Sequence, residues 1–71
     1  MENSGKPDLR LIVGRSMLWE KDLWRQPGRV GLAIRALQLM VDSEGEEAKD
    51  RREAEMLISK LYSASKKPKA N

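Results

Sequence analysis

The chain has 71 residues, of which 35% are charged and 4% are aromatic, and its formal net charge is +3. It contains no cysteine and no histidine, which excludes disulfides and thiolate zinc sites and removes the commonest general base. No run of residues reaches the roughly 18 apolar side chains that a membrane span needs, so we expect a cytoplasmic protein without membrane, metal or cofactor.

The first predicted helix covers residues 8–25, after a polar segment at 1–7 that is expected to be a disordered arm. Asp8 suits the N-cap position, and Pro27-Gly28 ends the pattern. One face of this helix follows the i, i+3, i+4, i+7 spacing at Leu9, Ile12, Val13, Ser16, Trp19 and Leu23. We expect this face to enter the core, with Trp19 as its anchor.

A short strand at residues 9–13 (LRLIV) is the alternative, because apolar side chains there alternate with Arg10. The chain would then run strand, helix, Pro-Gly turn, helix. Together with Gly28-Arg29 and the segment 33–37 (AIRAL), this order resembles the ribbon-helix-helix repressors over about half of the chain. The resemblance implies a dimer whose paired strands read the major groove of DNA.

The second predicted helix covers residues 29–42 and is apolar on nearly two faces. Its main stripe, expected to form the intramolecular core, consists of Val30, Ala33, Ile34, Leu37, Met40 and Val41. A second stripe lies nearly opposite and exceeds what a monomer of three helices needs to bury. We therefore predict a dimer or partner interface formed by Leu11, Leu18, Leu32, Ala36 and Leu39.

The third predicted helix covers residues 44–64, and Ser43 with Glu46 fits the S-x-x-E capping box at its start. Its apolar stripe consists of Ala54, Leu57, Ile58, Leu61 and Tyr62. Residues 65–71 are expected to be a disordered basic tail. The fold class is therefore all-α: one small three-helix domain at residues 8–64, with helices at about 8–25, 29–42 and 44–64.

Positive charge is concentrated at two places in the sequence. The segment 42–55 carries seven acidic and three basic side chains, and acidic residues early in a helix are what the helix dipole favours. The first half of the chain is instead rich in arginine, whose planar fork suits phosphates and base edges. The predicted nucleic-acid-binding residues are Arg10, Arg15, Arg25, Arg29 and Arg35, with Lys66, Lys67 and Lys69 of the tail.

No set of residues predicts catalysis: histidine and cysteine, the usual members of nucleophile–base pairs, are absent, and the carboxylates gather at an expected solvated helix start that implies no pocket. A core of this size rarely contributes more than about 3–5 kcal/mol, and a second subunit is the remaining means of stabilisation. The sequence thus predicts a small, basic, non-enzymatic, helical homodimer acting as a nucleic-acid-binding regulator or accessory factor. The alternative is a protein-binding adaptor or inhibitor that uses an apolar helix face and has no role with nucleic acid.

Overall fold

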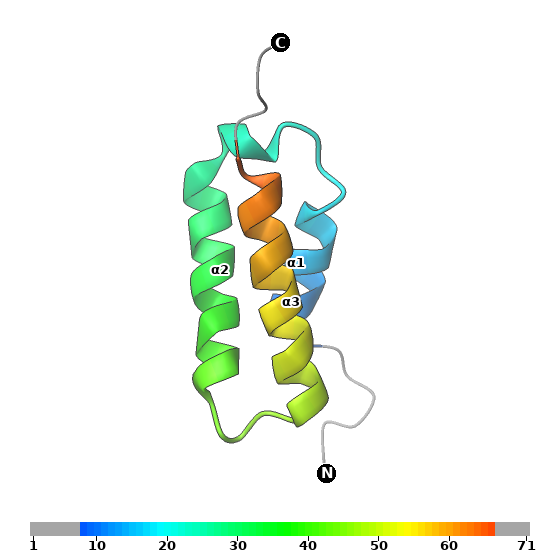
Figure 1. Cartoon of the computed structure of the whole chain (residues 1–71), viewed down its shortest axis with the longest axis vertical. Coiled ribbons are helices and arrows are strands. Elements are labelled where there is room, and N and C mark those ends of the chain that lie inside the picture. Colours follow the sequence, from blue (N-terminus) through cyan, green and yellow to red (C-terminus); the bar gives the residue numbers. More distant parts are fainter. Residues whose placement is uncertain (1–7, 67–71) are drawn as a thin grey trace.

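The three helices form an up-down-up bundle. The structure is a computed structural model and describes residues 8–66. Its elements are α1 (Leu9–Met17), the short 3-10 helix η1 (Leu23–Arg25), α2 (Pro27–Asp42) and α3 (Ala48–Ala64). In Figure 1, α2 and α3 lie side by side with opposite directions, and α1 lies behind α3 and to its right. The all-α fold class is therefore confirmed.

The strand alternative for residues 9–13 is not found, because this segment is the beginning of α1. Asp8 caps it as predicted: its carboxylate accepts a hydrogen bond from the backbone N–H of Arg10 at 2.8 Å. With a helix in place of the strand, the resemblance to ribbon-helix-helix repressors loses its basis.

Prediction of a single helix over residues 8–25 was wrong in its second half, because α1 ends at Met17. The chain then turns, and Asp22 adopts a left-handed backbone conformation with φ 56° before η1 begins. This connection crosses one end of the bundle (Figure 1). It lets Leu23 enter the core, where its side chain is 2% exposed, while the chain reverses its direction.

The face of α1 that enters the core is opposite to the predicted one. Leu11, Gly14 and Met17 are buried, whereas the predicted anchor Trp19 is 87% exposed. The reason is close packing at Gly14, where an added Cβ would lie 3.2 Å from Leu57 Cδ1 and 3.3 Å from Leu37 Cδ1. Only a face that presents a glycine lets α1 approach the other two helices this closely.

The core stripe of α2 is confirmed. Val30, Leu37 and Met40 are buried, and the other members pack partly buried against them: Ala33, Ile34 and Val41. The helix begins two residues earlier than predicted, with Pro27 in its first turn. Proline suits that position because its missing N–H would have no partner within the helix.

Helix α3 begins four residues later than predicted, so the capping box was wrong. The Ser43 hydroxyl instead accepts the backbone N–H of Gly45 at 3.3 Å, inside the loop that joins the antiparallel helices α2 and α3. The core stripe of α3 is confirmed at Ala54, Leu57 and Leu61, which are buried, and at Ile58, which packs against them. Tyr62 is the exception, since it is 57% exposed.

Candidate interaction surfaces

Three of the five arginines proposed for nucleic acid form ion pairs with carboxylates of the same chain. The Arg10 Nη2 atom lies 2.8 Å from Asp8 Oδ2 and 3.0 Å from Glu46 Oε2.

The other two pairs each join a guanidinium to one carboxylate by two hydrogen bonds. Arg15 donates to both carboxylate oxygens of Glu53, with Nη2–Oε1 at 2.7 Å. Arg29 donates to both oxygens of Glu20 at 2.8 Å. These are the forks that would otherwise face phosphate groups, and here they are occupied.

The ion pairs also lower the pKa values of the carboxyl groups. The hydrogen bond from Arg10 holds the pKa of Asp8 below its ordinary value. Arg29 lowers the pKa of Glu20 in the same way, and Arg15 lowers that of Glu53. Carboxyl groups are ionised at neutral pH in any case, and these shifts keep the three acids ionised to a lower pH, so each compensates the charge of its arginine.

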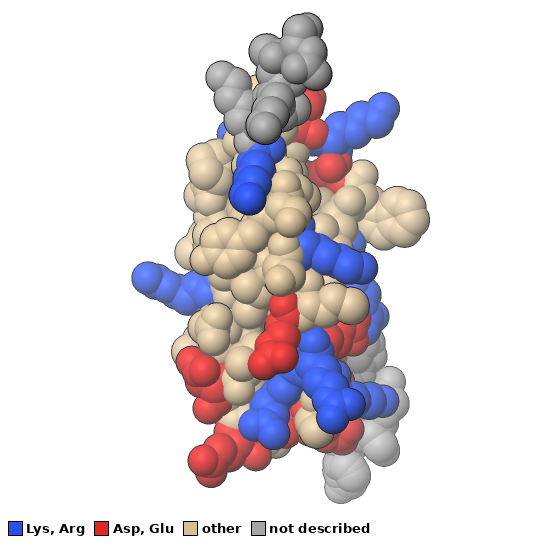
Figure 2. Space-filling view, viewed as in Figure 1, with Lys and Arg blue, Asp and Glu red and all other residues tan. Residues whose placement is uncertain are grey.

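Within residues 8–66, the remaining predicted cations are Arg25, Arg35 and Lys66, which lie on different segments of the chain. The Arg25 guanidinium lies 4.9 Å from the centroid of the Trp24 ring, Arg35 is exposed on α2, and Lys66 is exposed at the end of α3. Lys67 and Lys69 lie outside the described residues. On the face shown in Figure 2, the upper half is mostly uncharged with scattered basic side chains and a few acidic ones at the upper right, and basic and acidic side chains alternate in the lower half.

Two apolar grooves flank α2. The first, which we call the α1–α2 groove, has a volume of about 360 Å³ and carries arginines near both ends. Leu9 and Leu32 stand beside it and are 74% and 70% exposed. Its lining consists of Leu9, Arg10, Val13 and Met17 from α1, and of Arg29, Leu32, Ala33 and Ala36 from α2.

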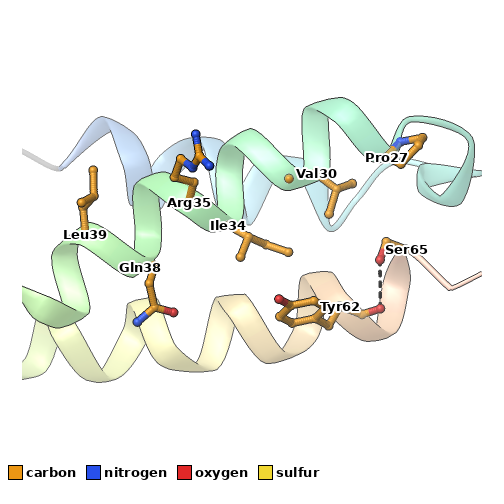
Figure 3. A pocket seen from close by; sticks show the side chains of 9 residues that line it. Pro27, Val30, Ile34, Arg35, Gln38, Leu39, Tyr62 and Ser65 are labelled. Carbon is orange, nitrogen blue, oxygen red and sulfur yellow. Dashed lines mark hydrogen bonds between the residues drawn. The ribbon is translucent and has the colours of Figure 1, made fainter.

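The second groove, the α2–α3 groove, has a volume of about 480 Å³. Figure 3 shows it on the side of the α2–α3 pair that faces away from α1, with Ile34 and the Tyr62 ring pointing toward each other across it. Among residues 8–66, Arg35 at the α2 margin is the only charged residue that lines it. The full lining consists of Pro27, Val30, Gly31, Ile34, Arg35, Gln38, Leu39, Tyr62 and Ser65.

The predicted interface residues separate into three groups. Leu32 and Ala36 line the α1–α2 groove, and Leu39 lines the α2–α3 groove. Leu11 is buried, so its assignment to a surface interface was wrong, whereas Leu18 is partly buried against the core and lines a shallow surface hollow beside α3. Both lie on the face of α1 that carries Gly14, and helical periodicity alone did not distinguish the two apolar faces of that helix.

Leu9 and Val13 are the exposed apolar residues of α1 that sequence reasoning placed in the core. The signal that could have placed them outside is Gly14: a helix packs most closely along the face with its smallest side chain, and the leucine and valine stripe lies away from that face.

A scan against protein-family models and searches of curated proteins and of solved structures found no match. Within residues 8–66, none of the helices has the length and apolar character required to cross a membrane. That same part of the chain holds no group of three or more acidic side chains placed to bind a metal ion. The surfaces described above are therefore the observations from which function can be argued.

Proposed function

We propose that this protein is a non-enzymatic interaction module that forms a homodimer through the α1–α2 groove. The observation that carries the proposal is the pair Leu9 and Leu32, two largely exposed leucines beside an apolar groove. A surface that combines projecting apolar side chains with an apolar groove is complementary to a second copy of itself. In a two-fold arrangement, each subunit inserts its leucines into the groove of the other.

Charge supports a second copy as the occupant of this groove. Arg10 and Arg29 lie near its two ends, and each is already paired with carboxylates of its own chain. Like charges that meet across an interface oppose association. Because these arginines are compensated within each subunit, two identical surfaces can meet with little repulsion.

The size of the core also favours a dimer. Among the described residues, nine apolar side chains are buried, and a core this small rarely contributes more than about 3–5 kcal/mol by itself. Covering the exposed leucines adds burial at roughly 25 cal/mol per Å² of apolar surface removed from water. Self-association therefore supplies stability that the single chain lacks.

Light scattering coupled to size-exclusion chromatography tests the proposal. We expect wild-type protein to elute with twice the chain mass of 8.1 kDa, and Leu32→Glu to elute as a monomer, because a buried unpaired carboxylate would oppose the interface. Leu39→Glu, which alters the other groove, is the matched control and should remain dimeric. A monomeric wild type, or a dimer that survives Leu32→Glu, would contradict the proposal.

Nucleic-acid binding is the second candidate, and one observation favours it. Arg25 lies over the Trp24 ring at the end of the bundle where α3 also ends (Figure 1), and where Lys66 leads into the lysine-containing tail. A cation beside an aromatic ring can bind a backbone phosphate and stack on an unpaired base. The proposed site is therefore this end of the bundle and excludes the three arginines held in ion pairs.

A gel-shift series with duplex DNA and single-stranded RNA tests this second candidate. Binding should be retained at about 50 mM salt and weaken steeply toward about 200 mM, because phosphate contacts release counterions. Arg25→Glu should abolish it, whereas Arg52→Glu, at an exposed site on α3, should reduce it only slightly. If neither nucleic acid is retained at the lower salt, the candidate is rejected.

A further inference from the structure

We propose that the α2–α3 groove binds an acidic amphipathic helix of another protein. This site lies on the opposite side of α2 from the α1–α2 groove, and it differs in charge. The proposal does not depend on the homodimer, because the two surfaces use different residues and are tested by different measurements.

The shape of the groove suits a helix. It extends along α2 from Pro27 to Leu39, which at 1.5 Å per residue corresponds to roughly 18 Å, or about three helical turns. On the other side of the α2–α3 pair, α1 packs against both helices (Figure 1). A helix in the open groove would therefore occupy the position of the fourth member of a four-helix bundle.

The lining supplies anchoring positions for an apolar face. Val30 and Ile34 lie one turn apart on α2, and the Tyr62 ring faces Ile34 from α3 (Figure 3). A docked helix meets such a surface with apolar side chains at i, i+3, i+4 and i+7. Tyrosine and arginine are among the residues that contribute most at protein interfaces, and this groove contains one of each.

Charge determines which kind of helix fits. Within residues 8–66, Arg35 is the only charged residue that lines the groove, and it makes no ion pair with any residue of that range. This contrasts with Arg10, Arg15 and Arg29, which are paired within the chain. A carboxylate beside the apolar face of the incoming helix would complete a two-point hydrogen bond with the Arg35 guanidinium.

Gly31 permits a direct test of occupancy. No atom lies within 4 Å of the position where its Cβ would be, and the residue lines the groove. A leucine there would project into the groove without displacing core side chains. Gly31→Leu therefore blocks the site while leaving the bundle intact, and circular dichroism verifies that the helical content is unchanged.

The experiment uses three fluorescently labelled peptides of equal length with the same leucine face, whose flanking positions are all glutamate, all glutamine or all lysine. Fluorescence anisotropy gives the dissociation constant of each peptide for the full chain. We expect the glutamate peptide to bind about tenfold more tightly than the lysine peptide, as one well-placed charge pair provides.

Two variants and one control connect the binding to the groove. Gly31→Leu should weaken the glutamate peptide by about tenfold or more, since it removes the apolar contacts. Arg35→Glu should reverse the preference toward the lysine peptide, and Arg52→Glu, outside the groove, should leave both affinities unchanged. The proposal is overturned if the glutamate peptide does not bind, if it binds no better than the lysine peptide, or if Gly31→Leu has no effect. Light scattering decides the dimer separately, so either proposal can fail alone.

Discussion

At the scale of single residues, Gly14 and Gly31 differ in whether the fold requires a residue without a side chain. Both lie inside helices, where glycine costs up to about 1 kcal/mol relative to alanine. At Gly14 the cost is offset by close approach, since an added Cβ would lie within 3.3 Å of both Leu57 and Leu37 side-chain carbons. At Gly31 nothing in the bundle requires the small residue, because the space beside it is open.

This difference predicts opposite effects of adding side-chain atoms. Gly14→Val should lower the free energy of unfolding by about 1–3 kcal/mol, because it overpacks the contact between α1 and α3. Gly31→Ala, the matched control, should raise it by about 0.5–1 kcal/mol through helix propensity and a less flexible unfolded chain. Urea denaturation measures both values, and a Gly14→Val protein as stable as wild type would contradict the packing account.

The ion pair of Glu53 predicts a dependence of stability on pH. Arg15 holds the folded-state pKa of Glu53 below its ordinary value. A lowered folded-state pKa gives stability that is present above the unfolded-state pKa and is lost as pH falls through the folded-state pKa. The free energy of unfolding should therefore fall between about pH 5 and pH 3, and it should fall less in Glu53→Gln.

Urea denaturation at both pH values checks this expectation. The control is Glu55→Gln, at an exposed position of α3 that forms no ion pair with residues of the described range. Its loss of stability on acidification should equal that of wild type. The same sign applies to Asp8 and Glu20, whose pKa values Arg10 and Arg29 lower, so Glu53→Gln removes only part of the wild-type decrease.

At the scale of elements, the connection between α1 and α2 matters most, because it determines which apolar residues are covered. A continuous helix to residue 25 would keep Trp19 and Leu23 on one face, one turn apart. The observed turn separates them: Leu23 enters the core and Trp19 stays in solvent. The larger of the two side chains thus contributes little to the stability of the bundle.

Alanine substitutions measure this separation. Leu23→Ala should destabilise the protein by about 2–5 kcal/mol, as expected for a buried leucine, and Trp19→Ala should change stability by no more than about 0.5 kcal/mol. Acrylamide quenching gives a second measurement, since the emission lost in Trp19→Ala should be the more readily quenched part. A large cost for Trp19→Ala would show that this side chain is covered.

At the scale of the whole molecule, the bundle has two apolar grooves around one helix, and they differ in electrostatics. The α1–α2 groove lies between arginines that the chain itself compensates, and Arg35 is the one charged residue between 8 and 66 that lines the α2–α3 groove. One surface therefore suits a copy of itself and the other suits an acidic partner. Helix α2 supplies residues to both, which makes it the centre of the proposed interactions.

A homodimer predicts stability that depends on protein concentration. Because association favours the folded state by mass action, a tenfold rise in concentration should add about 1.4 kcal/mol per mole of dimer to its apparent stability. The thermal midpoint of wild-type protein should rise accordingly, and that of Leu32→Glu should not change. Scanning calorimetry over a concentration series gives both curves, and a constant wild-type midpoint would argue against the dimer.

Part of the candidate surface could be predicted from the sequence. The second stripe of α2 identified Leu32 and Leu39 as surplus apolar residues, and both are exposed. Their assignment to one interface with Leu11 was wrong, since Leu11 is part of the core, and the two leucines of α2 line different grooves. The paired state of the arginines was also missed, because Arg10 and Arg15 bind carboxylates 36 and 38 positions away in the chain.

By itself, the sequence determined the all-α class, the positions of α2 and α3 to within a few residues, and the residues that those helices bury. Each of those two helices carries a main apolar stripe, and periodicity then identifies the inner face. Only the tertiary structure decided the inner face of α1, its end at Met17 and the ion pairs of its arginines. Helix α1 is apolar on two sides, so which side it buries depended on how closely Gly14 could approach Leu37 and Leu57. Its ion pairs depended on which carboxylates, distant in the sequence, this packing brought close to the arginines.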